Sequence, residues 1–218
     1  MSGVLVVGAG GHAKVVIATL RAAGHEVAGV LDDDAGRWGT SVLGCPVLGG
    51  LDRLEREEGA GAVIAVGDNE LRQAIAARYA GVRWVTAVHP AATVHETVRI
   101  GAGAVVFAGA VVQPDAVLGR HAIVNTGASV DHDCVLGDFA HVAPGAHLAG
   151  NVRLGTGAFL GVGCAVRPGV RVGEWTTVGA GGVVVRDLPP RVVATGVPAR
   201  PRPACPKPAC PKRDEVRV

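Results

Sequence analysis

Aromatic side chains are scarce in this chain of 218 residues, of which Phe, Trp and Tyr make up only 3%. Proteins that bind nucleic acid usually carry a strongly basic surface, and those that hold single strands stack the bases on aromatic rings. The formal net charge is only +2, so both features are missing and no nucleic-acid partner is expected. Long apolar runs are missing too, because Gly and charged residues interrupt the hydrophobic content, and we expect no membrane insertion.

Cysteine is sparse and odd in number, with five residues, two of which fall at inward positions of the repeat described below. Secreted disulfide-stabilised domains usually pair their cysteines, so we expect reduced thiols and a cytoplasmic location. The first residues lead straight into an apolar segment without a basic region or a cleavage site, which predicts no secretion signal. Cys205 and Cys210 lack the further ligands that zinc needs, so no metal is expected.

A six-residue repeat is the dominant feature that the sequence does contain. From Val88 to Val184 every sixth residue is a branched aliphatic, at seventeen consecutive positions. A small residue often stands two positions earlier and Gly one position later, where we expect Gly to supply corner conformations. A period of six fits neither an α-helix nor a long strand, and it is typical of a parallel β-helix. The unbroken register predicts that any active site lies on the outer faces of the coils.

A small Rossmann-like α/β domain with a parallel sheet is predicted for residues 1–86. Apolar runs predict strands at 4–8, 27–31, 62–66 and 82–86, and helical patterns cover 15–20, 51–58 and 69–79. Strands that alternate with helices at this spacing form parallel sheets. The Gly-rich turn that follows the first strand would direct the amides of a helix N-terminus at an anion.

Dinucleotide binding is one interpretation of that turn. Gly8, Gly10 and Ala13 satisfy the pattern G-x-G-x-x-G/A, and Asp32 follows Ala13 by 19 residues. A complete dinucleotide fold uses two mononucleotide-binding halves, and about 85 residues supply little more than one. A nucleotide or a nucleotide sugar at the same edge of the sheet is at least as compatible.

Together the two halves resemble one family, the bacterial sugar O- and N-acyltransferases with hexapeptide repeats. It includes UDP-4-amino-sugar N-acetyltransferases of bacillosamine synthesis, perosamine N-acetyltransferases and sialic acid O-acetyltransferases. The resemblance spans about residues 3–200, and the matching segments are Gly8–Lys14, Leu31–Asp33, Asn125–Thr126 and Val130–Cys134. It implies a left-handed parallel β-helix over residues 87–200 with three hexads per coil, acetyl-CoA as co-substrate, and a homotrimer with active sites between neighbouring subunits. Residues 201–218, rich in Pro, Lys and Arg, are predicted to form a disordered tail.

His132 is the candidate general base. It lies between Asp131 and Asp133, and a carboxylate can fix the tautomer of an imidazole and stabilise its cation. The resemblance implies that His132 deprotonates the acceptor, which attacks the thioester directly without an acyl-enzyme. Asp133 stands where the family usually has Glu, so we favour it as the orienting carboxylate, with Asp131 as the rival.

The resemblance also implies roles for further residues in binding. His141 would donate a hydrogen bond near the acetyl-CoA carbonyl, while Val162 and Ala180 would contact the cofactor through the backbone. Ala180 replaces a Gly found in some members of the family. The residues expected to bind the sugar nucleotide are Gly10, His12, Ala13 and Lys14 on the phosphate side, Asp32 and Asp33 on the base or ribose side, Gly67, and Asn125 near the sugar.

These residues favour an acetyl-CoA-dependent N-acetyltransferase that acts on the amino group of a nucleotide-linked amino sugar, with a UDP-4-amino-4-deoxy sugar as the first candidate. A sialic acid O-acetyltransferase is the alternative on the same fold. A non-catalytic β-helix scaffold or nucleotide-binding module is the alternative from another class of protein.

Overall fold

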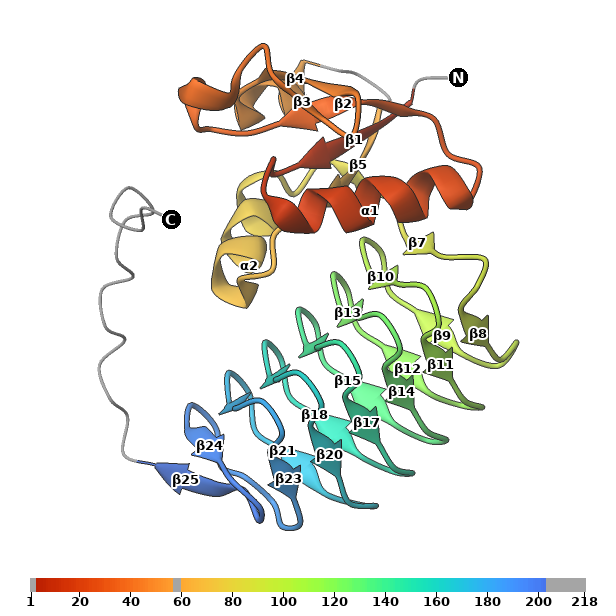
Figure 1. Cartoon of the computed structure of the whole chain (residues 1–218), viewed down its shortest axis with the longest axis vertical. Helices are drawn as coiled ribbons and strands as arrows, with labels where there is room; N and C mark the ends of the chain where they lie inside the picture. Colours follow the sequence, from red (N-terminus) through yellow and green to blue (C-terminus); the bar gives the residue numbers. More distant parts are fainter. Residues whose placement is uncertain (1–2, 57–59, 203–218) are drawn as a thin grey trace.

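The computed structural model describes residues 3–56 and 60–202, and Figure 1 shows an α/β domain at one end of a β-helix. The sheet of the α/β domain has the strand order β3 (Ser41–Val42), β4 (Cys45–Gly49), β2 (Val27–Leu31), β1 (Val4–Val7), β5 (Gly61–Ile64) and β6 (Arg83–Trp84). Its strands are parallel except β3, which pairs antiparallel with β4. The predicted tail lies almost entirely outside the described residues. Its first two residues, Pro201 and Arg202, belong to strand β25 (Arg200–Arg202), which pairs antiparallel with β24 (Val193–Thr195).

Most elements of the α/β domain lie where the sequence predicted them. They are β1 (Val4–Val7), α1 (Gly11–Ala22), β2 (Val27–Leu31), β5 (Gly61–Ile64), α2 (Asn69–Arg78) and β6 (Arg83–Trp84). Asp68 begins α2, because its side chain accepts a hydrogen bond from the Leu71 amide at 2.9 Å. The carboxyl ends of β2, β1 and β5 lie side by side at one edge of the sheet, since these strands are neighbours and parallel.

The sequence was only partly informative between residues 35 and 58. The segment predicted to be helical at 51–58 forms the short 3₁₀-helix η2 (Leu51–Glu55), whose buried residues, Leu51 and Leu54, are one 3₁₀ turn apart, while residues 57 and 58 lie outside the described residues. The sequence analysis also missed the 3₁₀-helix η1 (Ala35–Arg37) and a hairpin of β3 (Ser41–Val42) and β4 (Cys45–Gly49). Its two-residue turn, Leu43–Gly44, has φ angles of 47° and 75°.

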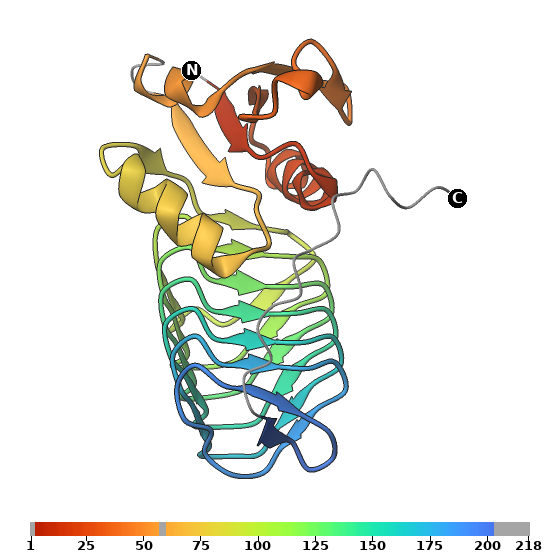
Figure 2. The ribbon, with the colours of Figure 1, turned by 90° about the vertical axis from the view of Figure 1, so that its left-hand side faces the viewer.

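The seventeen repeat positions all fall on two-residue strands, which confirms the predicted β-helix. Each strand pairs in parallel with strands 18 residues away, so three hexads make one coil of the left-handed β-helix. The coils stack as three flat sheets (Figure 2), with the orders β25-β24-β22-β19-β16-β13-β10-β7, β23-β20-β17-β14-β11-β8 and β21-β18-β15-β12-β9. The strands are β7 (Ala87–Val88), β8 (Thr93–Val94), β9 (Arg99–Ile100), β10 (Val105–Val106), β11 (Val111–Val112), β12 (Val117–Leu118), β13 (Ile123–Val124), β14 (Ser129–Val130), β15 (Val135–Leu136), β16 (His141–Val142), β17 (His147–Leu148), β18 (Arg153–Leu154), β19 (Phe159–Leu160), β20 (Ala165–Val166), β21 (Arg171–Val172), β22 (Thr177–Val178) and β23 (Val183–Val184).

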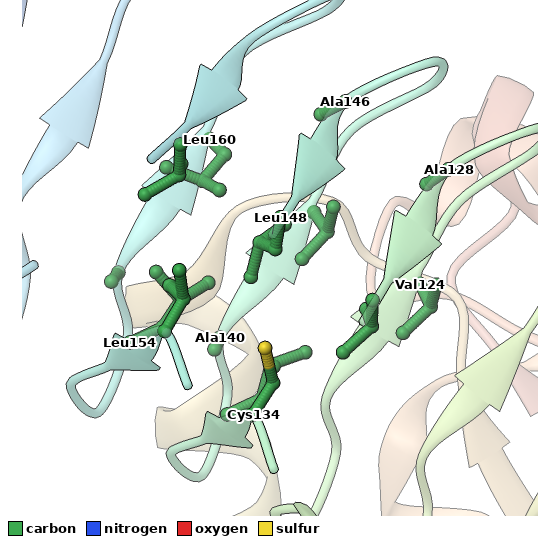
Figure 3. Close-up of a cluster of buried hydrophobic side chains, with 14 of the residues drawn as sticks. Val124, Ala128, Cys134, Ala140, Ala146, Leu148, Leu154 and Leu160 are labelled. Atoms are coloured by element: carbon green, nitrogen blue, oxygen red, sulfur yellow. The ribbon is translucent and has the colours of Figure 1, made fainter. Parts of the chain in front are cut away.

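The inward aliphatics form one continuous core. Figure 3 shows Leu148, Leu154 and Leu160 pointing into the coil, with small residues such as Ala140 and Ala146 beside them. Cys134 takes one of these small positions and is fully buried. The repeat therefore supplies a stack of equivalent apolar layers, in which each layer depends on the ones above and below it.

Glycine has a different role in the repeat from the one the sequence suggested. A Cβ atom on Gly119 would lie 2.5 Å from the Asp138 nitrogen, so the Gly residues that follow some of the aliphatics allow two coils to approach closely. The corner conformations belong to another position, three residues before each aliphatic. There φ lies between 55° and 73° in every hexad from Gly103 to Gly181, including the non-glycine residues Asp115, His121, Asp133, Phe139, Asn151 and Trp175.

The α/β domain lies on the first of the three sheets of the β-helix. Helix α1 packs on β7, and its residues Val16 and Ile17 share a buried cluster with Val105, Phe107 and Ile123 on the outer side of that sheet. The carboxyl edge of the α/β sheet lies against the same β-helix sheet, because the backbone of Gly67, which follows β5, lies beside His141 on β16. Any site at that edge is shared between the two domains.

Candidate active site

An anion site is formed where β1 ends and α1 begins. Gly10 is the N-cap of α1, and Cβ atoms added to Gly10 and Gly11 would meet nothing within 4 Å, so a ligand can approach the backbone here. The first amides of a helix have no partner within the helix and favour a phosphate. Lys14 is exposed in this first turn, where its side chain can reach a phosphate. The Ala13 side chain is buried and the Ala13 amide donates to the Gly10 carbonyl, so neither group of Ala13 is directed at a ligand.

The two expected aspartates lie at the end of β2, beside this turn. Oδ2 of Asp32 accepts a hydrogen bond from the Ala9 amide at 2.7 Å, which holds the Gly-rich turn in shape. Oδ1 of Asp33 accepts one from the Leu51 amide at 2.8 Å. Oδ1 of Asp32 also accepts from the Asp34 amide at 2.9 Å, so both oxygens of Asp32 order this edge of the sheet. Asp33 uses only Oδ1 in this way, and its Oδ2 could contact a ribose or base.

His132 lies at the corner between β14 and β15, where its Nδ1 is 2.7 Å from Oδ2 of Asp133. Neighbouring strand residues point to opposite faces, but Asp133 has a φ of 59°, and this corner conformation brings the two side chains together. Oδ1 of Asp131 instead accepts from the backbone amide of His132 at 2.8 Å. Asp133 therefore orients the ring, and Asp131 orders the backbone. A Cβ on Gly150 would come within 2.5 Å of the ring, so Gly150 makes room for it.

The electrostatics of His132 suit a base near neutral pH. The hydrogen bond to Asp133 raises the pKa of His132 above its usual value of 6.5, and the charges of both neighbouring aspartates act in the same direction. The imidazole side chain is 55% exposed. With Nδ1 held by Asp133, the free atom is Nε2, and this nitrogen can accept a proton from a ligand.

A second cluster lies between the domains, around His141 on β16. His141 is only 6% exposed, and its Nε2 lies 3.2 Å from Nδ2 of Asn125. The Thr126 amide donates to Oδ1 of Asn125 at 2.9 Å, so Nδ2 faces the ring and donates to Nε2. A neutral His141 then carries its proton on Nδ1, next to the backbone of Gly67. His12 adds a third side chain, with its ring 6.3 Å from that of His141.

Both histidines of this cluster are held neutral. Burial lowers the pKa of His141 to about 3 and that of His12 to about 4, and the nearby Arg72 guanidinium adds to both effects. The expected donor role of His141 needs revision in this arrangement, because its Nε2 is already an acceptor and its Nδ1 is buried. Asn125 keeps a second amide hydrogen that can be offered to a carbonyl oxygen.

The two expected CoA-binding residues lie on successive coils, below Asn125. Val162 is 56% exposed and its carbonyl accepts from the Gly181 amide at 2.8 Å, next to the exposed Ala180. Ala180 is not among the residues with positive φ, so alanine causes no backbone strain there. Asn125 directly follows strand β13 of the first sheet. The residues at the equivalent position after β19 and β22 are small, namely Gly161 and Gly179. This rim can accommodate a long, thin cofactor that runs away from Asn125.

One chain does not bring all expected residues together. His12, Gly67, Asn125 and His141 meet between the domains, on the first sheet of the β-helix. His132 lies at the corner between the second and third sheets, which in a three-sided coil is opposite the first sheet. The base and the remaining cluster are therefore separated by the core of the β-helix.

Two buried polar residues of α2 were missed by the sequence analysis. Arg72 is 1% exposed and Asn69 8% exposed, and both bond to the β-helix. Their signal was present, because Asn69, Arg72 and Ile75 recur every three residues and share the buried face of α2. The polar character of two of them concealed that face.

Other chemistries find little support among the described residues. Burial raises the pKa of the Cys134 thiol to about 11 and also raises that of Cys164, so neither is a ready nucleophile. Across residues 3–56 and 60–202 no group of three or more His, Cys, Asp or Glu side chains could hold a metal ion. In the same residues no helix is long and apolar enough to cross a membrane.

Comparisons with known proteins agree with the observed fold. The family described as the PglD N-terminal domain matches residues 3–79. The chain is 50% identical to a histidine-to-alanine mutant of GDP-perosamine N-acetyltransferase from Caulobacter crescentus, solved with CoA and GDP-perosamine. The TM-score is 0.88, with 94% of this chain and 98% of that one covered. It is 42% identical to the acetyltransferase domain of PglB from Neisseria gonorrhoeae, solved with acetyl coenzyme A, with a TM-score of 0.86 over 91% and 98% of the two chains.

A curated relative adds a more distant match. An uncharacterized protein of Acanthamoeba polyphaga mimivirus is 30% identical over 100 residues, which are 46% of this chain. The chain spans only 20% of the length of that protein.

Proposed function

The chain belongs to the bacterial sugar N-acyltransferases with hexapeptide repeats, and from this premise we propose that it transfers the acetyl group of acetyl-CoA to the amino group of a nucleotide-linked amino sugar. The observation that carries the proposal is the pairing of an oriented, exposed imidazole on the β-helix with an anion site at the sheet edge of the α/β domain. The first supplies a base and the second holds a diphosphate.

The reaction follows from the atoms of the site. The amine of the sugar attacks the thioester carbonyl, so a C–N bond forms, and Nε2 of His132 takes the proton that the nitrogen loses. The C–S bond breaks and CoA leaves as the thiol once its thiolate is protonated. Asp133 holds Nδ1 and stabilises the imidazolium that forms. The second amide hydrogen of Asn125 stabilises the carbonyl oxygen as negative charge develops there.

Substrate positions follow the order of the strands. Asp32 and Asp33 at the end of β2 receive the base or ribose, and Gly10, His12 and Lys14 receive the diphosphate. The sugar then extends toward Gly67, Asn125 and His141. Acetyl-CoA lies along the rim at Val162 and Ala180, with its thioester at Asn125. Both substrates are metabolites of the cytoplasm, and we place the enzyme there.

A homotrimer completes this site. Since His132 lies on the opposite side of the coil from Asn125 and His141, a second copy has to bring its own His132 to the cluster. Three β-helices packed around an axis would create three such sites, one at each contact between neighbours.

The test is CoA release by the purified protein, measured with acetyl-CoA and a panel of UDP-, GDP- and dTDP-linked 4-amino sugars. Free sialic acid is included, because its turnover alone would assign O-acetylation instead. The protein with His132→Ala is measured in parallel. The proposal expects turnover with an amino-sugar nucleotide, and silence across the panel in the wild-type protein would contradict it.

A further inference from the structure

We infer that Arg72 and Asn69 are positioning residues for this transfer, which fix the nucleotide-binding edge of the α/β domain against the β-helix strands that carry Asn125 and His141. The inference rests on the proposed function, because it concerns how the acceptor and the thioester are brought into register. Arg72 is 1% exposed and donates to protein acceptors, and Asn69 bonds to Gly157 and Arg72, so both act through the residues that they hold in place.

Arg72 uses its whole hydrogen-bonding capacity inside the protein. A guanidinium has five N–H groups, and the structure provides five uncharged acceptors for them. These are the carbonyl oxygens of Val66 at 3.0 Å, Gly67 at 3.4 Å, His121 at 3.0 Å and Phe139 at 2.7 Å, and Oδ1 of Asn69 at 2.8 Å. Burying a charge is costly, and burial lowers the pKa of Arg72 to about 10, although the nearby charge of Asp68 acts in the opposite direction. The five acceptors offset part of this cost, and they fix the position of the guanidinium from both domains.

The acceptors on the β-helix form a regular column. His121, Phe139 and Gly157 occupy the same corner on three successive coils, and each has a φ between 55° and 65°. At these corners the backbone hydrogen bond between neighbouring coils is accepted by the residue just before the corner residue. The Phe139 amide, for example, donates to the carbonyl of Arg120, which precedes His121. The column carbonyls are taken by α2 instead, because Arg72 donates to the first two and Nδ2 of Asn69 donates to Gly157 at 3.0 Å.

These three corners lead directly into the strands of the candidate site. The chain runs from His121 through β13 to Asn125, and from Phe139 to His141 on β16. On the opposite side of the guanidinium, Val66 and Gly67 form the turn after β5, and the Gly67 backbone lies beside His141. Arg72 therefore ties the sheet edge that receives the sugar nucleotide to the strands that receive the thioester.

Lysine could not replace Arg72 in this role. An ammonium has three N–H groups around a single atom and cannot span acceptors on both domains, whereas the planar guanidinium does. In the Arg72→Lys variant the charge is kept and the register between the domains is lost. A displacement of about 1 Å between reacting groups can reduce a rate by about 100-fold.

The experiment compares Arg72→Lys with Arg78→Lys, which changes an exposed arginine on the same helix. We measure kcat, KM for acetyl-CoA and, by calorimetric titration, the Kd of the nucleoside diphosphate that corresponds to the accepted sugar. Arg72→Lys is expected to lower kcat at least about tenfold. The KM for acetyl-CoA and the Kd of the nucleoside diphosphate should stay within about threefold of the wild type, since each domain keeps its own ligand contacts. Arg78→Lys should match the wild type.

A uniform loss of structure would change the binding constants together with kcat, so that result would overturn the inference, as would an unchanged kcat. If Arg72→Lys does not fold, Asn69→Ala removes the bonds to Gly157 and Ala158 and the contact with Arg72, and the same split between kcat and the binding measurements is expected at a smaller size. An unchanged kcat in folded Asn69→Ala would then refute the inference. Inactivity of the wild-type protein with every acceptor would instead refute the proposed function.

Discussion

The β-helix repeats one 18-residue coil, whereas the α/β domain uses each of its strands once. In the β-helix, residues that depart from the repeat are conspicuous, and His132, Asn125 and His141 are all polar side chains on a regular aliphatic framework. In the α/β domain, ligand contacts depend on turns at strand ends, whose shapes are set by distant partners such as Asp32 and Ala9. The difference suggests that the repeat fixes the chemistry, while the irregular domain selects and positions the acceptor.

The largest expected effect on stability concerns the repeated core. Leu148 is 2% exposed in the stack of layers, and Leu148→Ala should lower the free energy of unfolding by about 2–5 kcal/mol. Leu71 on α2 is 52% exposed, and Leu71→Ala should stay within about 0.5 kcal/mol of the wild type. Urea unfolding followed by circular dichroism measures both. Equal midpoints for the two variants would contradict the layered core.

Acid should weaken the contact between the two regions. The folded pKa values of His12 and His141 are about 4 and 3, below the ordinary 6.5, so the unfolded chain binds protons that the folded chain excludes. Stability is therefore complete above pH 6.5 and falls as the pH drops from 6.5 toward 4, by at most about 1.4 kcal/mol per pH unit for each histidine. Urea midpoints between pH 7.5 and 4.5 measure the slope.

The matched variants for this pH dependence are His12→Gln and His95→Gln. Burial also lowers the pKa of His121 to about 4, so His12→Gln removes one of three titrating side chains and should reduce the slope. His95→Gln changes an exposed histidine of the β-helix and should leave the slope unchanged. If stability depends on pH with the same slope in both variants, protonation of His12 at the contact between the domains does not cause the loss of stability.

Close approach between coils can be tested with a single methyl group. Gly119→Ala places a Cβ 2.5 Å from the Asp138 backbone and should cost about 1–3 kcal/mol, because the coils have to separate. Gly81 in the α/β domain has nothing within 4 Å of its notional Cβ, so Gly81→Ala is the control, with little or no loss. Thermal unfolding of both variants measures the difference. A tolerant Gly119 would mean that the coils are less tightly stacked than the structure indicates.

The smallest effect concerns the tuning of the base. Asp133→Asn removes the carboxylate that raises the pKa of His132, so the rising acidic limb of kcat/KM should move to lower pH, with a loss of about tenfold in kcat. Asp131→Asn removes one of the two neighbouring charges but keeps the hydrogen bond between Asp133 and the ring, so the acidic limb of its kcat/KM profile should move less. Rate profiles from pH 5 to 9 measure both. A larger shift for Asp131→Asn would exchange the roles of the two aspartates.

The sequence was informative wherever a residue's role depends on its own place in the pattern. The period of six predicted all seventeen strands from β7 to β23. The Asp-His-Asp triplet left two candidate partners for His132, and the resemblance to the family favoured Asp133, which contacts the ring. The sequence could not predict which glycines turn corners and which allow close approach, because that depends on atoms 18 or 19 residues away. Arg72 was missed for the same reason, since its acceptors lie as far as 67 residues along the chain.

The shared site between subunits is tested most directly by mixing two inactive variants. His132→Ala removes the base from the β-helix, and Lys14→Glu places a negative charge at the anion site of the α/β domain. Neither side chain is buried. In trimers of both variants formed by co-expression, some contacts combine an intact α/β domain of one copy with an intact His132 of its neighbour. The account predicts that activity returns to about a quarter of the wild type for random assortment. Mixed trimers that stay inactive would contradict it.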